Sequence, residues 1–184
     1  MWYIKSSSMS TLVNNYIYKA LDAYPYDLEA AMEALEYALA YDDKNWMALL
    51  LMGRIQFEVF QDAEKAISYY REALAVNIHA VQVYPYFFKV LLRQEDFQAL
   101  ASLIDFAMGI KGIDKAEVYK TKALAFERQQ RFKKALAELK QAKLHCYDED
   151  STEAIAREIS RVKGKLPKKK KKKSLEKKKN TKKK

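Results

Sequence analysis

The chain has 184 residues, of which 49% are apolar and 32% are charged, and it contains only four glycines and three prolines. This size allows one domain with a hydrophobic core, and the scarcity of glycine and proline favours helices over a turn-rich β fold. The single cysteine excludes an internal disulfide and is typical of a reducing compartment, so we expect a cytoplasmic protein. No segment approaches the ~20 consecutive apolar residues that span a bilayer.

The net charge of +10 is unevenly distributed along the chain. Residues 164–184 contain 13 lysines and a single acid, Glu176, whereas residues 1–163 contain 21 basic and 23 acidic residues. The part that is expected to fold is therefore close to neutral, and the basic character belongs to the C-terminal segment.

Small and apolar residues recur along the chain with steps of 35, 34 and 35 residues, which indicates an internal repeat. Within each repeat, apolar residues return every three or four positions, as they do on one face of a helix. Each period therefore predicts two antiparallel helices, A and B. The clearest series are Ala31, Ala66, Leu100, Ala135; Leu35, Tyr70, Ile104, Leu139; and Ala38, Ala73, Ala107, Ala142.

In chain order, we expect a disordered N-terminal extension at 1–8, a helical repeat domain at 9–163 and a lysine-rich tail at 164–184. The last helix of the domain, at about 151–163, has one apolar stripe and otherwise polar positions, and such a helix is typical of the cap that ends a solenoid. The four repeat units are expected at 9–41, 46–77, 81–110 and 115–146.

Acidic residues stand at the predicted starts of several helices. Aspartate accepts hydrogen bonds from the free N–H groups of a first helical turn, so Asp27, Asp62 and Asp96 predict helix starts. Asp114 with Glu117, and Asp150 with Glu153, have the spacing of capping boxes.

The repeat resembles the tetratricopeptide repeat (TPR) family over residues 9–147. This resemblance implies an all-α, tetratricopeptide-like α-solenoid with a concave groove lined mostly by A helices, which binds peptides or proteins and has no catalytic activity. The third unit departs from the family pattern, with Phe88 and Leu100 at positions for small residues and Pro85 early in its A helix. The residues that carry the resemblance are Leu49, Met52, Gly53, Phe57, Ala66, Tyr70 and Ala73 in the second unit, and Tyr119, Ala123, Phe126, Ala135, Leu139 and Ala142 in the fourth.

The register of the family implies an aromatic and basic groove. Arginine pairs with carboxylates through two hydrogen bonds, so an acidic segment or a C-terminal carboxylate is the expected ligand. Two alternatives stay open: these are solvated surface charges, or the groove binds the phosphates of a nucleic acid. The candidate groove residues are Leu50, Arg54, Phe57, Glu58, Tyr86, Lys89, Arg93, Lys120, Leu124 and Arg128.

Tyrosines are abundant and include two Tyr-Pro-Tyr triplets, at 24–26 and 84–86. Tyr70 and Tyr119 lie on the repeat series, so they are expected to pack between hairpins. For Tyr24, Tyr26 and Tyr86, packing and contact with a partner are equally reasonable interpretations.

The lysine tail has almost no apolar residues, and its like charges repel, so it is predicted to be disordered. A tail of this kind binds polyanions such as nucleic acid, the ribosome or an anionic membrane surface by neutralising phosphates, without reading a sequence. The alternative is a tail that only confers solubility. Its candidate contacts are Lys168, Lys169, Lys170, Lys171, Lys172, Lys173, Lys177, Lys178 and Lys179.

Chemistry-bearing motifs are missing from the sequence. His79, His145 and Cys146 do not have the spacing of a zinc site, and no glycine-rich phosphate loop occurs. We therefore expect no enzyme activity and no cofactor. The leading hypothesis is an interaction scaffold whose tail tethers it to a polyanion, and self-association through solenoid ends or tyrosine patches stays open.

Overall fold

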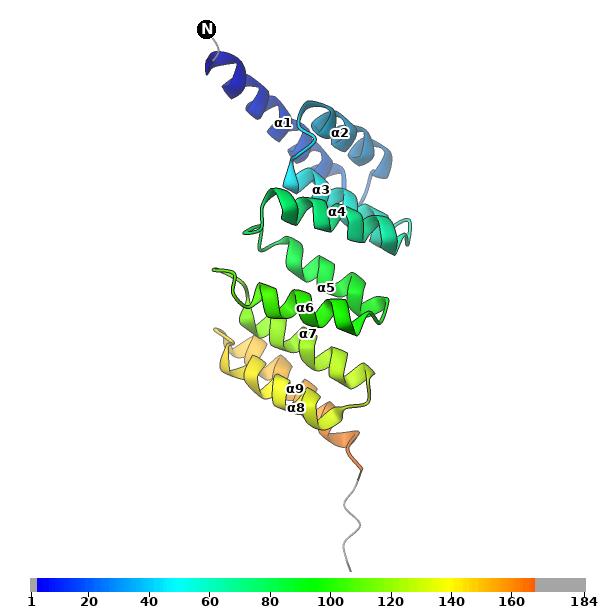
Figure 1. Ribbon diagram of the computed structural model, residues 1–184, viewed down its shortest axis with the longest axis vertical. Coiled ribbons are helices and arrows are strands. Elements are labelled where there is room, and N and C mark those ends of the chain that lie inside the picture. Colours follow the sequence, from blue (N-terminus) through cyan, green and yellow to red (C-terminus); the bar gives the residue numbers. More distant parts are fainter. Residues whose placement is uncertain (1–2, 168–184) are drawn as a thin grey trace, which may run out of the picture.

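The computed structural model describes residues 3–167, and all regular secondary structure in that part is helical (Figure 1). Helices pack as successive antiparallel hairpins, α1 with α2, α3 with α4, α5 with α6 and α7 with α8, and α9 packs on α8. The predicted all-α array of helix pairs is confirmed. The helices are α1 (Tyr3–Ala23), α2 (Leu28–Tyr41), α3 (Trp46–Glu58), α4 (Ala63–Val76), α5 (Val83–Arg93), α6 (Phe97–Ala107), α7 (Lys115–Arg128), α8 (Phe132–Leu144) and α9 (Glu149–Gly164).

The first helix begins earlier than the sequence suggested. α1 starts at Tyr3, so residues 3–8 are helical and do not form the disordered extension expected at 1–8. Neither glycine nor proline occurs between Tyr3 and Ala23, and nothing in the chain interrupts the helix until Pro25. The lysines from Lys168 onward lie outside the described residues.

The predicted aspartates cap the helix starts, with one exception. Asp27, Asp62, Asp96 and Asp114 each accept a hydrogen bond from the backbone N–H three residues on, at 3.0 to 3.1 Å. The predicted cap at Asp150 is wrong. Asp148 caps α9 instead, because the backbone N–H of Ser151 donates to its Oδ1 at 2.7 Å and the helix begins at Glu149.

All twelve positions of the three repeat series are buried. Seven of the twelve are alanines, and the other five are leucine, isoleucine or tyrosine. Gly53 on α3 faces the fully buried ring of Tyr70 on α4, and a Cβ at this glycine would lie 2.5 Å from Tyr70 Cε1. The glycine is therefore needed for the close contact between these two helices.

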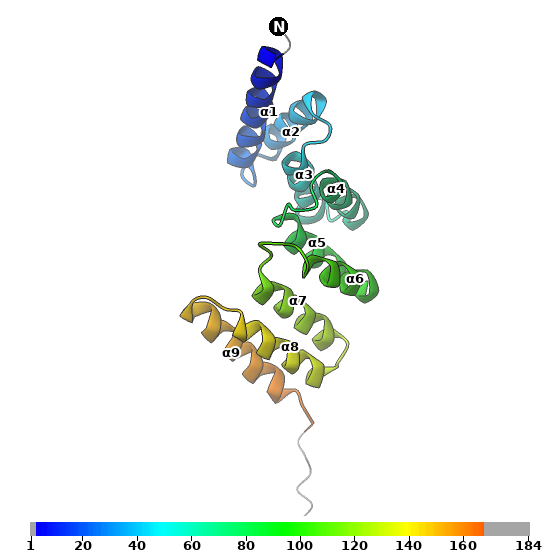
Figure 2. The ribbon, with the colours of Figure 1, turned by 60° about the vertical axis from the view of Figure 1, so that its left-hand side comes forward.

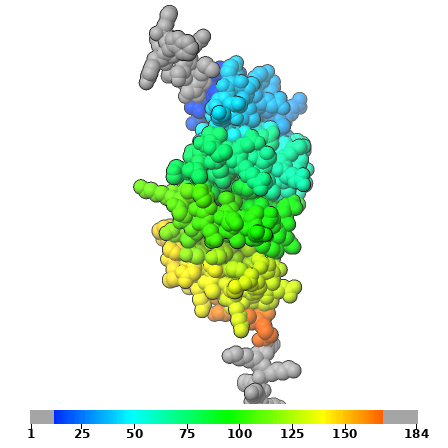
Figure 3. Space-filling view, in the orientation of Figure 1, coloured from blue at the N-terminus to red at the C-terminus, as the bar shows by residue number. Residues whose placement is uncertain are grey.

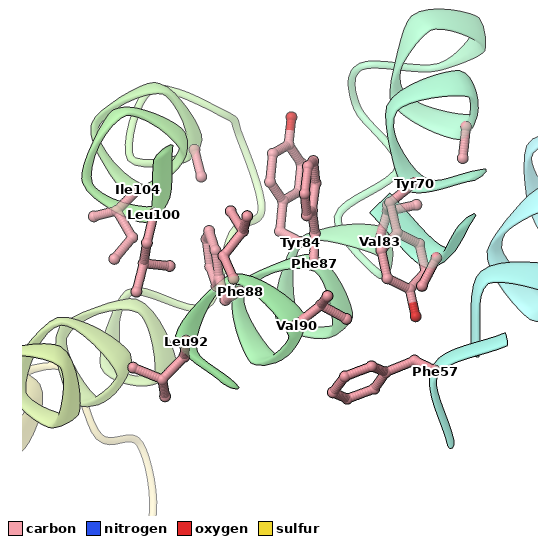
Figure 4. Packing of buried hydrophobic residues seen from close by; sticks show 14 of the residues in the cluster. Phe57, Tyr70, Val83, Tyr84, Phe87, Phe88, Val90, Leu92, Leu100 and Ile104 are labelled. Atoms are coloured by element: carbon pink, nitrogen blue, oxygen red, sulfur yellow. The ribbon is translucent and has the colours of Figure 1, made fainter. Parts of the chain in front are cut away.

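The third hairpin uses large side chains at two positions where the family has small ones. Phe88 and Leu100 are almost fully buried, and with Tyr84, Phe87 and Ile104 they fill the core around α5 (Figure 4). Pro85 is the third residue of α5, where its missing N–H would have had no helical partner. These departures from the family pattern leave the stack of helical hairpins intact. Figures 2 and 3 show the hairpins as successive layers along one axis.

Candidate functional site

Two pockets adjoin one another on the surface formed by the odd-numbered helices. The first, of about 290 Å³, lies between α5 and α7 and is lined by Tyr86 and Lys89 among others. The second, of about 590 Å³, lies between α7 and α9. Glu117, Lys120 and Leu124 line both pockets, so they form one hollow that we call the α5–α7–α9 face.

A second group of predicted residues meets where α3 approaches α5. The guanidinium of Arg54 lies 5.1 Å from the ring centroid of Tyr24 and 4.7 Å from that of Tyr86. The Glu58 carboxylate accepts hydrogen bonds from the Tyr24 hydroxyl at 2.6 Å and from Lys89 Nζ at 3.1 Å. Residues of three successive hairpins thus converge on the Arg54–Glu58 pair.

Hydrogen bonding and burial shift two pKa values in this group. Burial, together with the hydrogen bond to Glu58, raises the pKa of Tyr24 to about 12. Burial acts to raise the pKa of Glu58 as well, but the hydrogen bonds from Tyr24 and Lys89 outweigh it and lower that pKa below its ordinary value. Glu58 is therefore ionised and Tyr24 protonated at neutral pH.

Phe57 and Leu50 belong to the interior more than to the open surface. Phe57 is buried, and the charged groups of Lys89 and Arg93 lie 5.9 and 5.1 Å from its ring centroid. Leu50 is half-buried against the central core. Phe57 and Leu50 therefore belong to the packed interior near the α3–α5 contact, whereas Lys89 and Arg93 are exposed to solvent.

The three α7 residues have different environments. Leu124 is 39% exposed and lies where the two pockets join. Lys120 forms an ion pair with Glu117, one turn earlier on the same helix. Arg128 Nη1 donates to the backbone carbonyl of Leu92 at 2.9 Å, so Arg128 ties α7 to the end of α5.

The surface is less basic than the sequence suggested. Arg54 and Lys89 share the carboxylate of Glu58, and Lys120 is paired with Glu117. Sequence reasoning missed Glu117 and the α9 residue Arg157, both of which line the α7–α9 pocket. Glu117 lies three residues before Lys120, and that helical spacing is the signal that could have indicated the pair.

The remaining polar candidates have structural contacts. The ring of His145 stacks on Tyr119, with 5.4 Å between centroids, and Cys146 Sγ contacts the carbonyl of Ala142 at 3.5 Å. Within residues 3–167, no group of three His, Cys, Asp or Glu side chains is arranged to hold a metal ion. In the same part of the chain, no helix has both the length and the apolar composition needed to cross a membrane.

Stacked helical hairpins of this kind define the TPR fold, and comparison with solved structures supports the assignment. PilF of Pseudomonas aeruginosa superposes with a TM-score of 0.69 at 16% identity, covering 86% of this chain and 75% of that one. A thermophilic TPR protein of Thermus thermophilus, TTC0263, gives 0.64 at 19% identity, covering 83% and 84%. MamA from Desulfovibrio magneticus RS-1 gives 0.62 at 15% identity, covering 85% and 94%.

The chain therefore has a TPR-like fold. No protein-family model matches the sequence, and no curated protein matches it either. The likeness is one of fold, and the partner has to be argued from this chain's own surface.

Proposed function

We propose that this chain is a non-catalytic scaffold that holds a segment of another protein on the α5–α7–α9 face. The observation that carries the proposal is the pair of adjoining pockets, which share Glu117, Lys120 and Leu124. A half-exposed leucine between two hollows offers an apolar contact at the centre of a polar rim, which is the arrangement of energetically important sites in protein interfaces.

The charges around these pockets favour a particular ligand chemistry. Lys89, Lys120 and Arg157 lie on three successive odd-numbered helices, and Asp114, Glu117 and Glu158 are the acids that line the same pockets. A segment with an apolar side chain against Leu124 and a carboxylate near Lys120 would replace the Glu117–Lys120 pair with a contact to the partner. Exposed pairs of this kind contribute only about 0–1 kcal/mol, so their exchange costs little.

The lysine tail supports a second element of the proposal. Residues 168–184 contain 12 lysines and one acid, a charge density that attracts nucleic acid or another polyanion through counterion release. Binding of nucleic acid by the groove itself would depend on Arg54, Lys89, Arg93 and Lys120. It has less support, because Arg54 and Lys89 are paired with the carboxylate of Glu58, and Lys120 is paired with Glu117.

The groove is tested with two matched leucine substitutions in the full chain. Leu124→Asp places a charge at the junction of the pockets, and Leu144→Asp makes the same change at a 75% exposed leucine outside them. A partner recovered from the source cells and identified by mass spectrometry should be lost with Leu124→Asp and kept with Leu144→Asp. Equal recovery with both variants would contradict the groove proposal.

The tail is tested by fluorescence anisotropy of labelled RNA and duplex DNA over a salt series. The full chain should bind both, with affinity falling steeply as salt rises, and replacing Lys168–Lys173 with glutamine should weaken both to the same degree. Binding that stays unchanged when Lys177–Lys179 and Lys182–Lys184 are replaced as well would move the site onto the helical array and favour the nucleic-acid alternative.

A further inference from the structure

The two ends of the solenoid differ in charge. Residues 1–44 contain seven acidic and three basic residues, whereas residues 114–163 contain nine acidic and twelve basic ones and are followed by the lysine tail. The first hairpin and the end of α9 lie at opposite ends of the long axis (Figure 1). The molecule is therefore electrically polar along its axis, negative at the N-terminal end and strongly positive at the C-terminal end.

The N-terminal end carries an aromatic surface. The ring of Tyr16 on α1 stacks on Tyr37 and Tyr41 of α2, with 5.3 and 6.1 Å between centroids. Tyr37 and Tyr41 are each 48% exposed. We call these three residues the tyrosine edge.

The tyrosine edge faces away from the second hairpin. Leu39 packs against two groups of buried residues, one in α1–α3 and one in α3–α7. Its side of α2 is therefore turned toward the next layer. Tyr37 and Tyr41 are each two positions from Leu39, about 200° around the helix, and so lie on roughly the opposite side. Within the described residues, α1 and α2 pack on one another and on α3, and no further hairpin covers the tyrosine edge.

This edge already holds an ammonium group against a ring. Lys19 Nζ lies 5.5 Å from the centroid of Tyr16, which is cation–π geometry. Glu33 is one helical turn before Tyr37 on the same face of α2, and it is exposed. Tyrosine faces beside a carboxylate, in a hairpin with excess negative charge, are complementary to lysine side chains.

We propose that the tyrosine edge binds the lysine tail, residues 168–184, of a second copy of this chain. The tail begins after Pro167, at the far end of the stack, and its 17 residues can reach at most about 60 Å when fully extended. To bind its own edge, the tail would have to run along the whole stack, whereas the tail of a neighbour has no such constraint. Pairing of two tyrosine edges would instead bring two acidic hairpins together.

The proposed contact is head-to-tail. A heterologous contact of this type leaves a free edge and a free tail on every assembly, so it predicts open oligomers that grow with concentration. The contact is also electrostatic, so added salt should dissociate the oligomers.

Sedimentation velocity of the full chain at low salt tests this contact. The expected result is a weight-average mass that rises above the 21.4 kDa of the monomer with concentration and returns to it in ~0.5 M salt. An excess of a synthetic peptide of residues 168–184 should also restore the monomer. Changing Tyr37 and Tyr41 together to serine should weaken association about tenfold, since each exposed cation–π contact contributes about 0.5–1 kcal/mol.

The matched control is Tyr147→Ser, which removes a 96% exposed tyrosine at the other end of the array and should leave association unchanged. Circular dichroism of each variant verifies the helical content. A full chain that stays monomeric at low salt would overturn the proposal. Association that resists the tail peptide but is lost in the Tyr37/Tyr41 variant would also overturn it, and would indicate pairing of two edges.

Discussion

The guanidinium of Arg161 on α9 forms two hydrogen bonds to the carboxylate of Glu127 on α7, at 2.5 and 2.6 Å. Lys165 Nζ donates to the same carboxylate at 2.6 Å. Glu127 is 9% exposed at its side chain and is therefore shielded from water. This carboxylate holds the C-terminal half of α9 against α7, and the α7–α9 pocket lies toward the opposite ends of these two helices.

Glu127→Gln is expected to loosen α9. The hydrogen bonds from Arg161, followed by those from Lys165, hold the pKa of Glu127 at about 2, against the opposing effect of burial. Because the folded state depresses this pKa, the stabilisation is complete above about pH 4.3, the ordinary value for glutamate, and is lost as the pH falls toward 2. The variant should lose about 1–2 kcal/mol of unfolding free energy at pH 7.

Urea unfolding followed by circular dichroism at pH 7 and at pH 3 measures this effect. The difference between wild type and Glu127→Gln should shrink at the lower pH. Glu153→Gln, an exposed position on α9, serves as the control and should change stability little at either pH. A difference that is the same at both pH values would show that the carboxylate charge is not responsible.

Gly53→Ala should destabilise the second hairpin, although alanine is the better helix former. The added Cβ would lie 2.5 Å from Cε1 of Tyr70, whose buried ring has no space to retreat. Overpacking costs about 1–3 kcal/mol, which exceeds the gain of about 1 kcal/mol in helix propensity. The melting temperature should fall, whereas Gly164→Ala, with no neighbouring atom within 4 Å of its Cβ, should leave it unchanged or slightly higher.

The same Gly53–Tyr70 contact illustrates what the sequence could predict. Tyr70 lies on the series with Leu35, Ile104 and Leu139, and Gly53 recurs with Phe88 and Ala123 at the same period, so the period alone predicts that both residues belong to the core. Helix starts at Asp27, Asp62 and Asp96 were predicted for a similar reason, since a cap depends only on residues within one turn. Local chemistry and periodicity therefore sufficed for the hairpins.

Contacts between layers were not predicted. Tyr24 and Glu58 are 34 residues apart, as are Glu127 and Arg161, which is one repeat in each case. The period indicates which layers are adjacent, but the choice of partner depends on side-chain reach and on the rotation between layers. A search for opposite charges one period apart would have included Glu127 with Arg161, and that pair determines how α9 is held.

Tyr24→Phe tests the hydrogen bond that links the first hairpin to α3. The substitution keeps the ring beside Arg54 but removes the hydroxyl that donates to Glu58, so we expect a loss of about 0.5–1.5 kcal/mol at pH 8. Folding raises the pKa of Tyr24 from about 10 to about 12, so this stabilisation is complete below pH 10 and is lost as the pH rises toward 12.

Urea unfolding at pH 8 and ultraviolet titration of the tyrosines provide the two measurements. In the titration, the variant should lack one tyrosine that ionises late, near pH 12. Tyr26→Phe is the matched control because Tyr26 is 92% exposed, and it should leave both the stability and the late-ionising tyrosine unchanged. Equal losses of stability from the two variants would argue against a specific bond to Glu58.

The start of α9 separates two aspartates that the sequence alone does not distinguish. Asp148 accepts a hydrogen bond from the N–H of Ser151 at 2.7 Å, and hydrogen bonds from Ser151 lower its pKa. Asp150 lies inside the first turn, where its negative charge is favourable to the helix dipole. Asp148→Ala should therefore speed hydrogen exchange of the Ser151 amide and lower the melting temperature more than Asp150→Ala does. The reverse order would place the cap at Asp150 and begin α9 two residues later.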